Sequence, residues 1–173
     1  MRMKVIPLTS DYEMKPFDCG DAELNGFLLH EAKAFAESRL ANTFLICDDG
    51  AIVGYFSLFN DKIAKQDVSK AAWRKIKKLF PHSKHFGSYP AVKIGRFAIS
   101  LQYRNRGMGH KMMVVLQYRL KRETTSSTFR FLTVDAYQGA VPFYERNGFK
   151  RLTLTEEGDT TCGMYFDMKT LDV

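Results

Sequence analysis

Several residue types are scarce in this sequence, and each shortage excludes a class of protein. Only 3 of the 173 residues are cysteine, and their spacing matches no metal-binding motif. A small, odd number of cysteines excludes a disulfide scaffold and is typical of a reduced, intracellular chain. No apolar run approaches the ~18 residues that span a membrane, and the opening MRMKVIPLTS lacks the apolar core of a signal peptide. We therefore expect a cytoplasmic protein that does not enter a membrane.

The residues that are abundant fit one globular domain. Hydrophobic residues make up 45% of the chain and aromatic residues 13%, which is enough apolar surface for a core without disulfides. No repeat, low-complexity segment or linker divides the chain, so we expect a single domain over residues 1–173. Lys and Arg outnumber Asp and Glu by 26 to 19, and the net charge of +7 favours phosphate-bearing partners without distinguishing a nucleotide from a nucleic acid.

Strand and helix patterns alternate along the sequence and predict a mixed α/β fold. Runs of β-branched and aromatic residues predict strands over residues 3–8, 43–47, 51–59, 92–100, 129–134 and 161–168. Apolar residues three and four apart predict helices from Asp21 to about Arg39 and over residues 67–80, 107–121 and 140–147. We expect a twisted mixed sheet flanked by helices, with strands 92–100 and 129–134 parallel because a helix connects them. Gly95 inside its strand predicts a bulge or a close backbone approach.

The segment that follows strand 92–100 carries the strongest chemical signal. Arg104-Asn105-Arg106-Gly107-Met108-Gly109 is a glycine-bearing loop at the start of a predicted helix. Glycines there let a phosphate approach backbone N–H groups, and the helix dipole together with Arg104, Arg106 and Lys111 attracts anions. A tight connection with solvated arginines explains the same residues equally well, so the loop alone does not decide the function.

Two motifs follow one another in this half of the chain. The first is R-x-x-G-x-G between a strand and a helix, formed by Arg104, Gly107 and Gly109. The second is F-Y-E-x-x-G-F, formed by Phe143, Tyr144, Glu145, Gly148 and Phe149. In their order and spacing the two motifs resemble the GCN5-related N-acetyltransferase (GNAT) superfamily, most clearly over residues 90–150. The resemblance implies the GNAT fold and direct transfer of an acetyl group from acetyl-CoA to a primary amine.

The resemblance also implies which residues bind acetyl-CoA. The pyrophosphate would lie on backbone amides with ionic support from neighbouring cations, and this part of the site would consist of Arg104, Asn105, Arg106, Gly107, Met108, Gly109, His110 and Lys111. The main chain of Phe97, Ala98 and Ile99 would bind the pantetheine amides, and a strand N–H would face the thioester oxygen.

Tyr144 is the residue that the resemblance implies for catalysis. Attack of an amine on the thioester expels a thiolate, and a phenol with a pKa of ~10 is a reasonable proton donor to it. Without the resemblance, an aromatic core residue would be the better interpretation of Tyr144. No general base stands out, because strand 92–100 has no carboxylate and both Glu145 and Asp135 are typical of solvated positions. Tyr137 stands where the family often has Asn, and so leaves a pantetheine contact open.

Two further segments, FDCGDAELNGFL and YPAVKIGRFAI, resemble the acetyltransferase toxins of bacterial toxin–antitoxin pairs and their non-toxic relatives. This narrower resemblance implies that the acceptor is an aminoacyl-tRNA and that an antitoxin is a partner. The basic face of predicted helix 67–80, with Lys70, Arg74, Lys77 and Lys78, would then contact RNA, although such a face is usually just solvated.

Other functions stay open at this point. The amine acceptor could equally be a small molecule or a peptide, and the chain could form a homodimer. An alternative of another class is a non-catalytic module that binds acyl-CoA as a sensor.

Histidine and cysteine residues favour no further chemistry. His82 and His85 have a spacing compatible with metal ligation, but no Cys or carboxylate cluster accompanies them, so we expect no metal. Cys19, Cys47 and Cys162 are scattered, which favours small buried thiols over nucleophiles. We therefore expect direct transfer rather than an acyl-cysteine intermediate.

Overall fold

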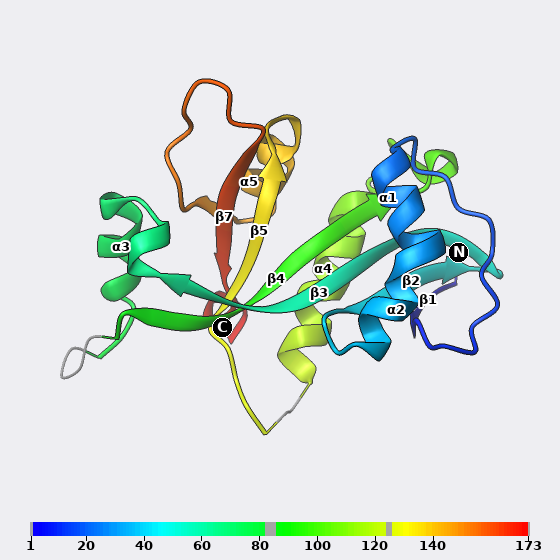
Figure 1. Cartoon of the computed structure of the whole chain (residues 1–173), viewed down its shortest axis with the longest axis horizontal. Coiled ribbons are helices and arrows are strands. Elements are labelled where there is room, and N and C mark those ends of the chain that lie inside the picture. Colours follow the sequence, from blue (N-terminus) through cyan, green and yellow to red (C-terminus); the bar gives the residue numbers. More distant parts are fainter. Residues whose placement is uncertain (1, 82–85, 124–125, 173) are drawn as a thin grey trace. The chain divides into compact units, whose positions relative to one another are not determined.

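The computed structural model describes residues 2–81, 86–123 and 126–172 of the chain (Figure 1). These residues fall into two compact units. Unit 1 contains the residues up to Asn60 together with Ile94–Leu120, and unit 2 contains Asp61–Lys93 together with the residues from Lys121 onwards. The long strands β3 (Ala51–Ala64) and β4 (Ser88–Ile99) each have one end in unit 1 and the other end in unit 2.

Within the described residues, seven strands form one sheet in the order β1-β2-β3-β4-β5-β7-β6. Besides β3 and β4, the strands are β1 (Met3–Pro7), β2 (Asn42–Asp48), β5 (Phe131–Tyr137), β6 (Lys150–Arg151) and β7 (Thr161–Asp167). The α-helices are α1 (Ala22–Gly26), α2 (Ala32–Glu37), α3 (Lys70–Lys77), α4 (Met108–Arg122) and α5 (Val141–Arg146). The predicted mixed α/β fold, a sheet flanked by helices, is confirmed.

β5 runs parallel to β4, as the sequence predicts for two strands that a helix connects. Two contacts between the strands show this direction, because the second lies further along both strands than the first. The Arg130 amide donates to the Pro90 carbonyl (3.1 Å) and, further along both strands, the Lys93 ammonium pairs with the Asp135 carboxylate (2.9 Å). The pairs β1–β2, β2–β3, β5–β7 and β6–β7 are antiparallel, so the sheet is mixed.

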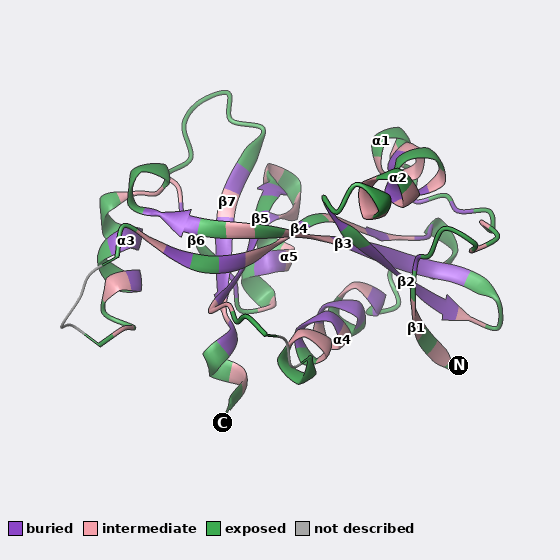
Figure 2. Ribbon diagram, turned by 60° about the horizontal axis from the view of Figure 1, so that its bottom comes forward, coloured by how far each residue is buried: buried purple, intermediate pink, exposed green. Residues whose placement is uncertain are grey.

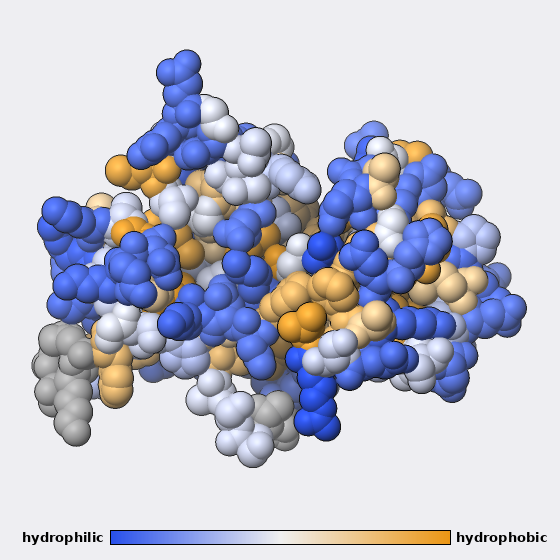
Figure 3. Space-filling view, in the orientation of Figure 1, coloured by the Kyte–Doolittle hydropathy of each residue, from blue (hydrophilic) through white to orange (hydrophobic). Residues whose placement is uncertain are grey.

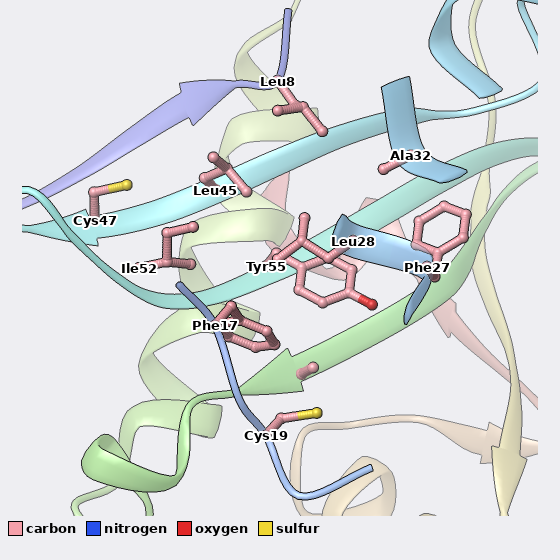
Figure 4. Packing of buried hydrophobic residues seen from close by; sticks show 11 residues of the cluster. Leu8, Phe17, Cys19, Phe27, Leu28, Ala32, Leu45, Cys47, Ile52 and Tyr55 are labelled. Atoms are coloured by element: carbon pink, nitrogen blue, oxygen red, sulfur yellow. The ribbon is translucent and has the colours of Figure 1, made fainter. Parts of the chain in front are cut away.

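Unit 1 packs helices on both faces of its strands (Figure 2). Leu45 of β2 and Tyr55 of β3 belong to a buried cluster that includes Phe27 from the helical segment after β1 (Figure 4). Neighbouring residues of a strand point to the opposite face. There the guanidinium of Arg119 on α4 lies 4.4 Å from the ring centroid of Phe44 on β2. Helices α1 and α2 therefore cover one face of these strands and α4 covers the other.

The helix predicted from Asp21 to about Arg39 is present but contains one π-helical turn, Phe27–Glu31, between α1 and α2. Asp21 caps the segment, since its carboxylate accepts a hydrogen bond from the Leu24 amide (3.0 Å). The hydroxyl of the buried Tyr55 donates to the Leu24 carbonyl (2.7 Å), which gives this carbonyl a partner from outside the helix just before the wider turn. The sequence does not predict the π-helical turn, because Tyr55, whose hydroxyl bonds next to this turn, is 31 residues away from Leu24.

In unit 2, α3 packs its apolar side on the sheet. Ser69 caps the helix, and Trp73 and Ile76 are buried in a cluster with Phe131 of β5. The helix predicted over residues 67–80 is shorter in the structure, because a 3-10 turn precedes the cap.

Both long strands extend beyond the predicted strands 51–59 and 92–100. Polar residues interrupt the strand pattern after Phe59, yet Asp61 stays in β3, where its carboxylate accepts a hydrogen bond from the Thr133 hydroxyl (2.6 Å). Pro90 is tolerated in β4, where its carbonyl still accepts a hydrogen bond from the amide of Arg130, directly before β5. The two-residue strand β6 is too short to leave a sequence pattern.

The cysteines lie where their scattered positions predict. Cys19, Cys47 and Cys162 are free, buried thiols.

No helix among residues 2–81, 86–123 and 126–172 combines the length and the apolar character that crossing a membrane requires.

Two glycines in the long strands of unit 1 are required by close approaches. A Cβ atom on Gly95 would lie 2.1 Å from the Phe59 ring. The sequence predicts either a bulge or a close approach at Gly95, and the structure has a close approach. A Cβ atom on Gly54 would lie 2.6 Å from the carbonyl oxygen of Ala98. The second contact is the stricter one, because a backbone carbonyl of β4 cannot turn aside as a ring can.

We expect Gly54→Ala to lower the free energy of unfolding by about 1–3 kcal/mol, the range for overpacking a well-filled core. The matched control is Gly26→Ala on α1, where nothing lies within 4 Å of the added Cβ and alanine favours the helix. Urea denaturation followed by circular dichroism measures both. Equal stability of the two variants would contradict the close approach of Gly54 to Ala98.

Candidate active site

The segment from β4 to α4 forms an exposed turn with an unusual backbone. The 3-10 helix Leu101–Tyr103 follows β4, and Met108 begins α4. Between them, Asn105 and Gly107 adopt the left-handed conformation, with φ angles of 59° and 69°. Residues 104–107 are exposed, whereas Met108 is buried and anchors the start of α4 in the core. The predicted glycine loop is therefore a tight turn held between a strand and a helix.

The first turn of α4 is the place where this backbone can bind an anion. The first N–H groups of an α-helix have no carbonyl partner within the helix, and the dipole makes that end electropositive. In α4 the helical bond from Lys111 runs from its amide to the Gly107 carbonyl (3.2 Å). The amides of Met108 and Gly109 thus lie before the helical hydrogen-bond ladder, next to the exposed glycine turn.

The cations of the turn are used in different ways. The guanidinium of Arg104 donates through Nη2 to the carbonyl of Cys19. Arg106 and Lys111 are exposed, and neither forms an ion pair with a carboxylate of the described residues. Arg104 therefore shapes the turn, whereas Arg106 and Lys111 are the cations that remain for a phosphate group.

The segment Phe17–Asp21 braces the turn. The Leu101 amide donates to the Asp18 carbonyl (2.9 Å), at the start of the turn. The Asp18 carboxylate accepts hydrogen bonds from the Gly20 amide (2.8 Å) and the Asn25 side chain (2.9 Å), and these bonds lower the pKa of Asp18. The motif FDCGDAELN thus has a structural role, because it folds on itself and holds the end of β4.

The end of β4 contributes backbone rather than side-chain groups. Phe97, Ala98 and Ile99 are its last residues, and Ala98 is buried. The Ser100 amide donates to the Val53 carbonyl (2.8 Å), so the chain stays bonded to β3 up to the turn. The structure therefore brings the strand residues and the loop residues predicted for acetyl-CoA binding together in unit 1, as one continuous segment.

Tyr144 lies on α5, in unit 2, inside an aromatic cluster. The ring centroids of Phe143 and Phe149 lie 5.2 Å and 5.3 Å from that of Tyr144, and both rings meet it edge-on. Tyr144 is 6% exposed, and burial raises the pKa of its phenol above the ordinary value. A phenol is protonated at neutral pH even at its ordinary pKa, and this is the form a general acid needs.

Strand β4 has no carboxylate of its own, but α1 brings one to it. Oε1 of Glu23 accepts hydrogen bonds from Nε and Nη2 of Arg96, at 3.3 Å and 3.0 Å. The same guanidinium lies 3.9 Å from the ring centroid of Phe27. Glu23 and Arg96 are 73 residues apart, so no spacing in the sequence reveals the pair.

The other carboxylates considered as bases are ion-paired. Asp135 pairs with Lys93 (2.9 Å), and Glu145 pairs with an arginine of β6 (3.0 Å). Both carboxylates are largely exposed, as expected for solvated surface residues. The carboxylate of Asp61 accepts a hydrogen bond from the Thr133 hydroxyl. The sequence did not single out Asp61, because 72 residues separate it from Thr133.

Metal ligation finds no support in the described part of the chain. There, His, Cys, Asp and Glu side chains nowhere gather in groups of three or more that could hold an ion. His82 and His85 lie outside the described residues. The absence of a metal stays a prediction.

A comparison with known families places these features in a class. Over residues 18–170 the sequence matches the family described as an acetyltransferase (GNAT) domain, and the chain belongs to that family. It is therefore an acyltransferase of the N-acetyltransferase type, with acetyl-CoA as the acyl donor.

Solved structures share the fold over nearly the whole chain. A bacterial toxin superposes with a TM-score of 0.81 at 18% identity, covering 98% of this chain and 93% of its own. AtaT complexed with acetyl-methionyl-tRNAfMet gives 0.74 at 22% identity, covering 99% and 98%. A Tyr-to-Phe mutant of AtaT, bound to the C-terminus of the antitoxin AtaR and acetyl-CoA, gives 0.70 at 21% identity, covering 99% and 97%.

We expect Gly107→Ala to lower the free energy of unfolding by about 1 kcal/mol, because an L-residue is strained in the left-handed conformation of residue 107. Gly139→Ala is the matched control. Nothing lies within 4 Å of the added Cβ at either position, but only Gly107 has a positive φ. The difference in urea denaturation midpoint therefore isolates backbone strain, and no difference would mean that the turn does not need it.

Proposed function

We propose that the end of β4 and the turn before α4 form the acetyl-CoA site. The pyrophosphate lies on the backbone amides of residues 105–110, and Arg106 and Lys111 neutralise its charge. Arg104 contributes by shaping the turn, since its guanidinium donates to the Cys19 carbonyl and its amide to the Leu101 carbonyl. The main chain of Phe97–Ile99 binds the pantetheine arm. The left-handed turn, exposed between a strand and a helix, is the observation that carries this assignment.

The proposed reaction is direct acetyl transfer with Tyr144 as the general acid. The neutral amine attacks the thioester carbonyl carbon, and backbone N–H groups of β4 stabilise the oxyanion. The C–S bond then breaks, and the Tyr144 phenol gives its proton to the departing thiolate while the amine loses a proton to water. A phenol is protonated at the pH of the reaction, as this role requires.

We propose an aminoacyl-tRNA as the acceptor, through its free amino group. AtaT, which shares the fold at 22% identity over 99% of this chain, is solved with an acetylated aminoacyl-tRNA. The excess of cations, with a net charge of +7, suits a large polyanionic substrate. A small amine or a peptide would need no such charge.

The remaining expectations fit this proposal. We propose a cytoplasmic location, where charged tRNA occurs, and an antitoxin as a partner, because AtaT is solved with AtaR. A single domain over residues 1–173 and a homodimer stay predictions.

The test of the acceptor measures acetyl-CoA binding by calorimetry and then thiol release in the same preparation. Pooled aminoacyl-tRNA is compared with deacylated tRNA and with a panel of small amines and peptides. We expect release with aminoacyl-tRNA and none with deacylated tRNA. Release with the small-amine panel alone would overturn the acceptor, and acetyl-CoA binding without any turnover would favour the sensor.

We expect Tyr144→Phe to lower kcat by roughly 100-fold or more, because the leaving thiolate loses its proton donor. The affinity for acetyl-CoA, measured by calorimetry, should stay nearly unchanged. Tyr118→Phe is the control, since it removes a phenol that is 50% exposed on α4. An unchanged kcat in Tyr144→Phe would return Tyr144 to the role of a core residue.

A further inference from the structure

Two opposite charges meet in unit 1 directly before the residues proposed to bind pantetheine. Arg96 of β4 immediately precedes Phe97, and Glu23 lies in the first turn of α1. Oε1 of Glu23 accepts hydrogen bonds from Nε and Nη2 of Arg96, at 3.3 Å and 3.0 Å. Neither side chain takes part in the proposed acetyl transfer. The two are named the Glu23–Arg96 pair below.

Aromatic rings hold the Arg96 guanidinium in place. It lies 3.9 Å from the ring centroid of Phe27 and 5.9 Å from that of Phe35. Phe27 begins the π-helical turn, and turns of this kind are frequent at functional sites. The side chain of Arg96 is 21% exposed, so it is packed on these rings and still partly open to a ligand.

Each member of the pair keeps a polar group without a partner. In the described part of the chain, no hydrogen bond reaches Nη1 of Arg96 or Oε2 of Glu23. A guanidinium carries five N–H donors in one plane, and a carboxylate accepts through both of its oxygens. The pair therefore presents unused N–H donors and an unused acceptor oxygen close together.

Stability of the fold gives little reason for the pair. The side chain of Glu23 is 53% exposed, and an ion pair this open to water adds little to stability. The Tyr55 hydroxyl already ties α1 to β3, because it donates to the Leu24 carbonyl (2.7 Å). Binding of a ligand accounts better for the polar groups that the pair leaves open.

The surface around the pair mixes charged and apolar groups. In the space-filling view, hydrophobic residues lie between hydrophilic ones over α1 and α2 (Figure 3). Phe35 and Phe59, whose ring centroids are 6.2 Å apart, supply apolar surface on this side of the strands. A ligand that fits here has polar groups for the pair and an apolar part for the rings, as an amino acid with its side chain has.

We propose that the Glu23–Arg96 pair binds the aminoacyl end of the acceptor. Its amino group donates to Oε2 of Glu23, and the carbonyl oxygen attached to the same carbon accepts from Nη1 of Arg96. Because Arg96 directly precedes Phe97, an amine held by the pair lies next to the strand residues proposed to hold the acyl donor. The inference rests on the proposed function, since it assigns the residues that hold the acceptor of the same reaction.

Arg96→Lys tests the pair, because lysine keeps the charge and loses the planar set of N–H donors. We expect KM for pooled aminoacyl-tRNA to rise roughly tenfold or more, the loss typical of a hydrogen bond from a charged donor. We expect kcat to stay nearly unchanged, since the contact is the same before and during the reaction. Thiol release measures both constants.

Two further constants separate binding of the acceptor from a structural role. The affinity for acetyl-CoA, measured by calorimetry, and the inhibition constant of deacylated tRNA should keep their wild-type values, because neither ligand touches the pair. If the pair only held α1, Arg96→Lys would also loosen the brace Phe17–Asp21 that precedes this helix and would weaken acetyl-CoA binding.

Glu23→Gln should raise the same KM by a similar factor, and Arg96→Lys/Glu23→Gln should be little worse than either variant, because both residues hold one group. Arg119→Lys is the control for the arginine, since its guanidinium lies on the Phe44 ring at the opposite face of the strands. Glu13→Gln is the control for the carboxylate, since Glu13 is also ion-paired and exposed. Both controls should keep the wild-type KM, and circular dichroism checks that all variants fold.

Two small amines separate this inference from the proposed acceptor. Leucinamide carries the amino group and the carbonyl of an aminoacyl end, and isoamylamine is the same molecule without its carboxamide. If only the small-amine panel reacts, the wild type should prefer leucinamide in kcat/KM, and Arg96→Lys should reduce that preference roughly tenfold or more.

Three results would overturn the inference while leaving acetyl transfer in place. An unchanged KM in both Arg96→Lys and Glu23→Gln would mean that the pair touches no acceptor. A parallel loss of acetyl-CoA affinity would mean that the pair only holds α1. A preference for leucinamide that Arg96→Lys leaves intact would assign the carbonyl to another group. No turnover with any amine would overturn the proposed function as well.

Discussion

Two hydrogen bonds to the main-chain carbonyls of Asp18 and Cys19 hold the turn on which the proposed acetyl-CoA site depends. The Leu101 amide reaches the first carbonyl (2.9 Å) and the Arg104 guanidinium reaches the second. Asn105 follows directly and is held in the left-handed conformation, which costs free energy for a residue with a side chain. Such a backbone persists only where its surroundings determine it. The segment before α1 therefore contributes to the site by fixing the direction of the amides that follow.

Local patterns in the sequence predict most of the fold, and distant contacts account for the rest. Strand and helix periodicity places the elements that form the sheet and its flanking helices, because each element buries one face or stripe of its own residues. The π-helical turn was not predicted, since the Tyr55 hydroxyl that bonds beside it belongs to another element. The extension of β3 was missed for the same reason, because the Asp61 carboxylate finds its hydrogen-bond partner, the Thr133 hydroxyl, on another strand.

In the candidate site, too, the sequence reveals the residues that are contiguous and misses the partners that are distant. The glycine turn and FYERNGF are contiguous in sequence, so a motif can identify them, and the family match supports the class of reaction. The partners that set the properties of these residues are not contiguous. The Arg104 guanidinium donates to the Cys19 carbonyl instead of remaining for a phosphate. Glu23 of α1 accepts hydrogen bonds from Arg96 of β4. Burial of Tyr144, which raises the pKa of its phenol, is likewise a property of the packed cluster.

The proposed acetyl-CoA site and the proposed acceptor need different kinds of recognition. A turn that presents backbone amides in a fixed direction suits one group of constant shape, as the pyrophosphate of the acyl donor is. Cationic side chains attract an RNA through its phosphates, and phosphate contacts position an RNA without reading its sequence. Charge alone therefore cannot select among aminoacyl-tRNAs, and any selection has to come from groups that touch a base or the amino acid.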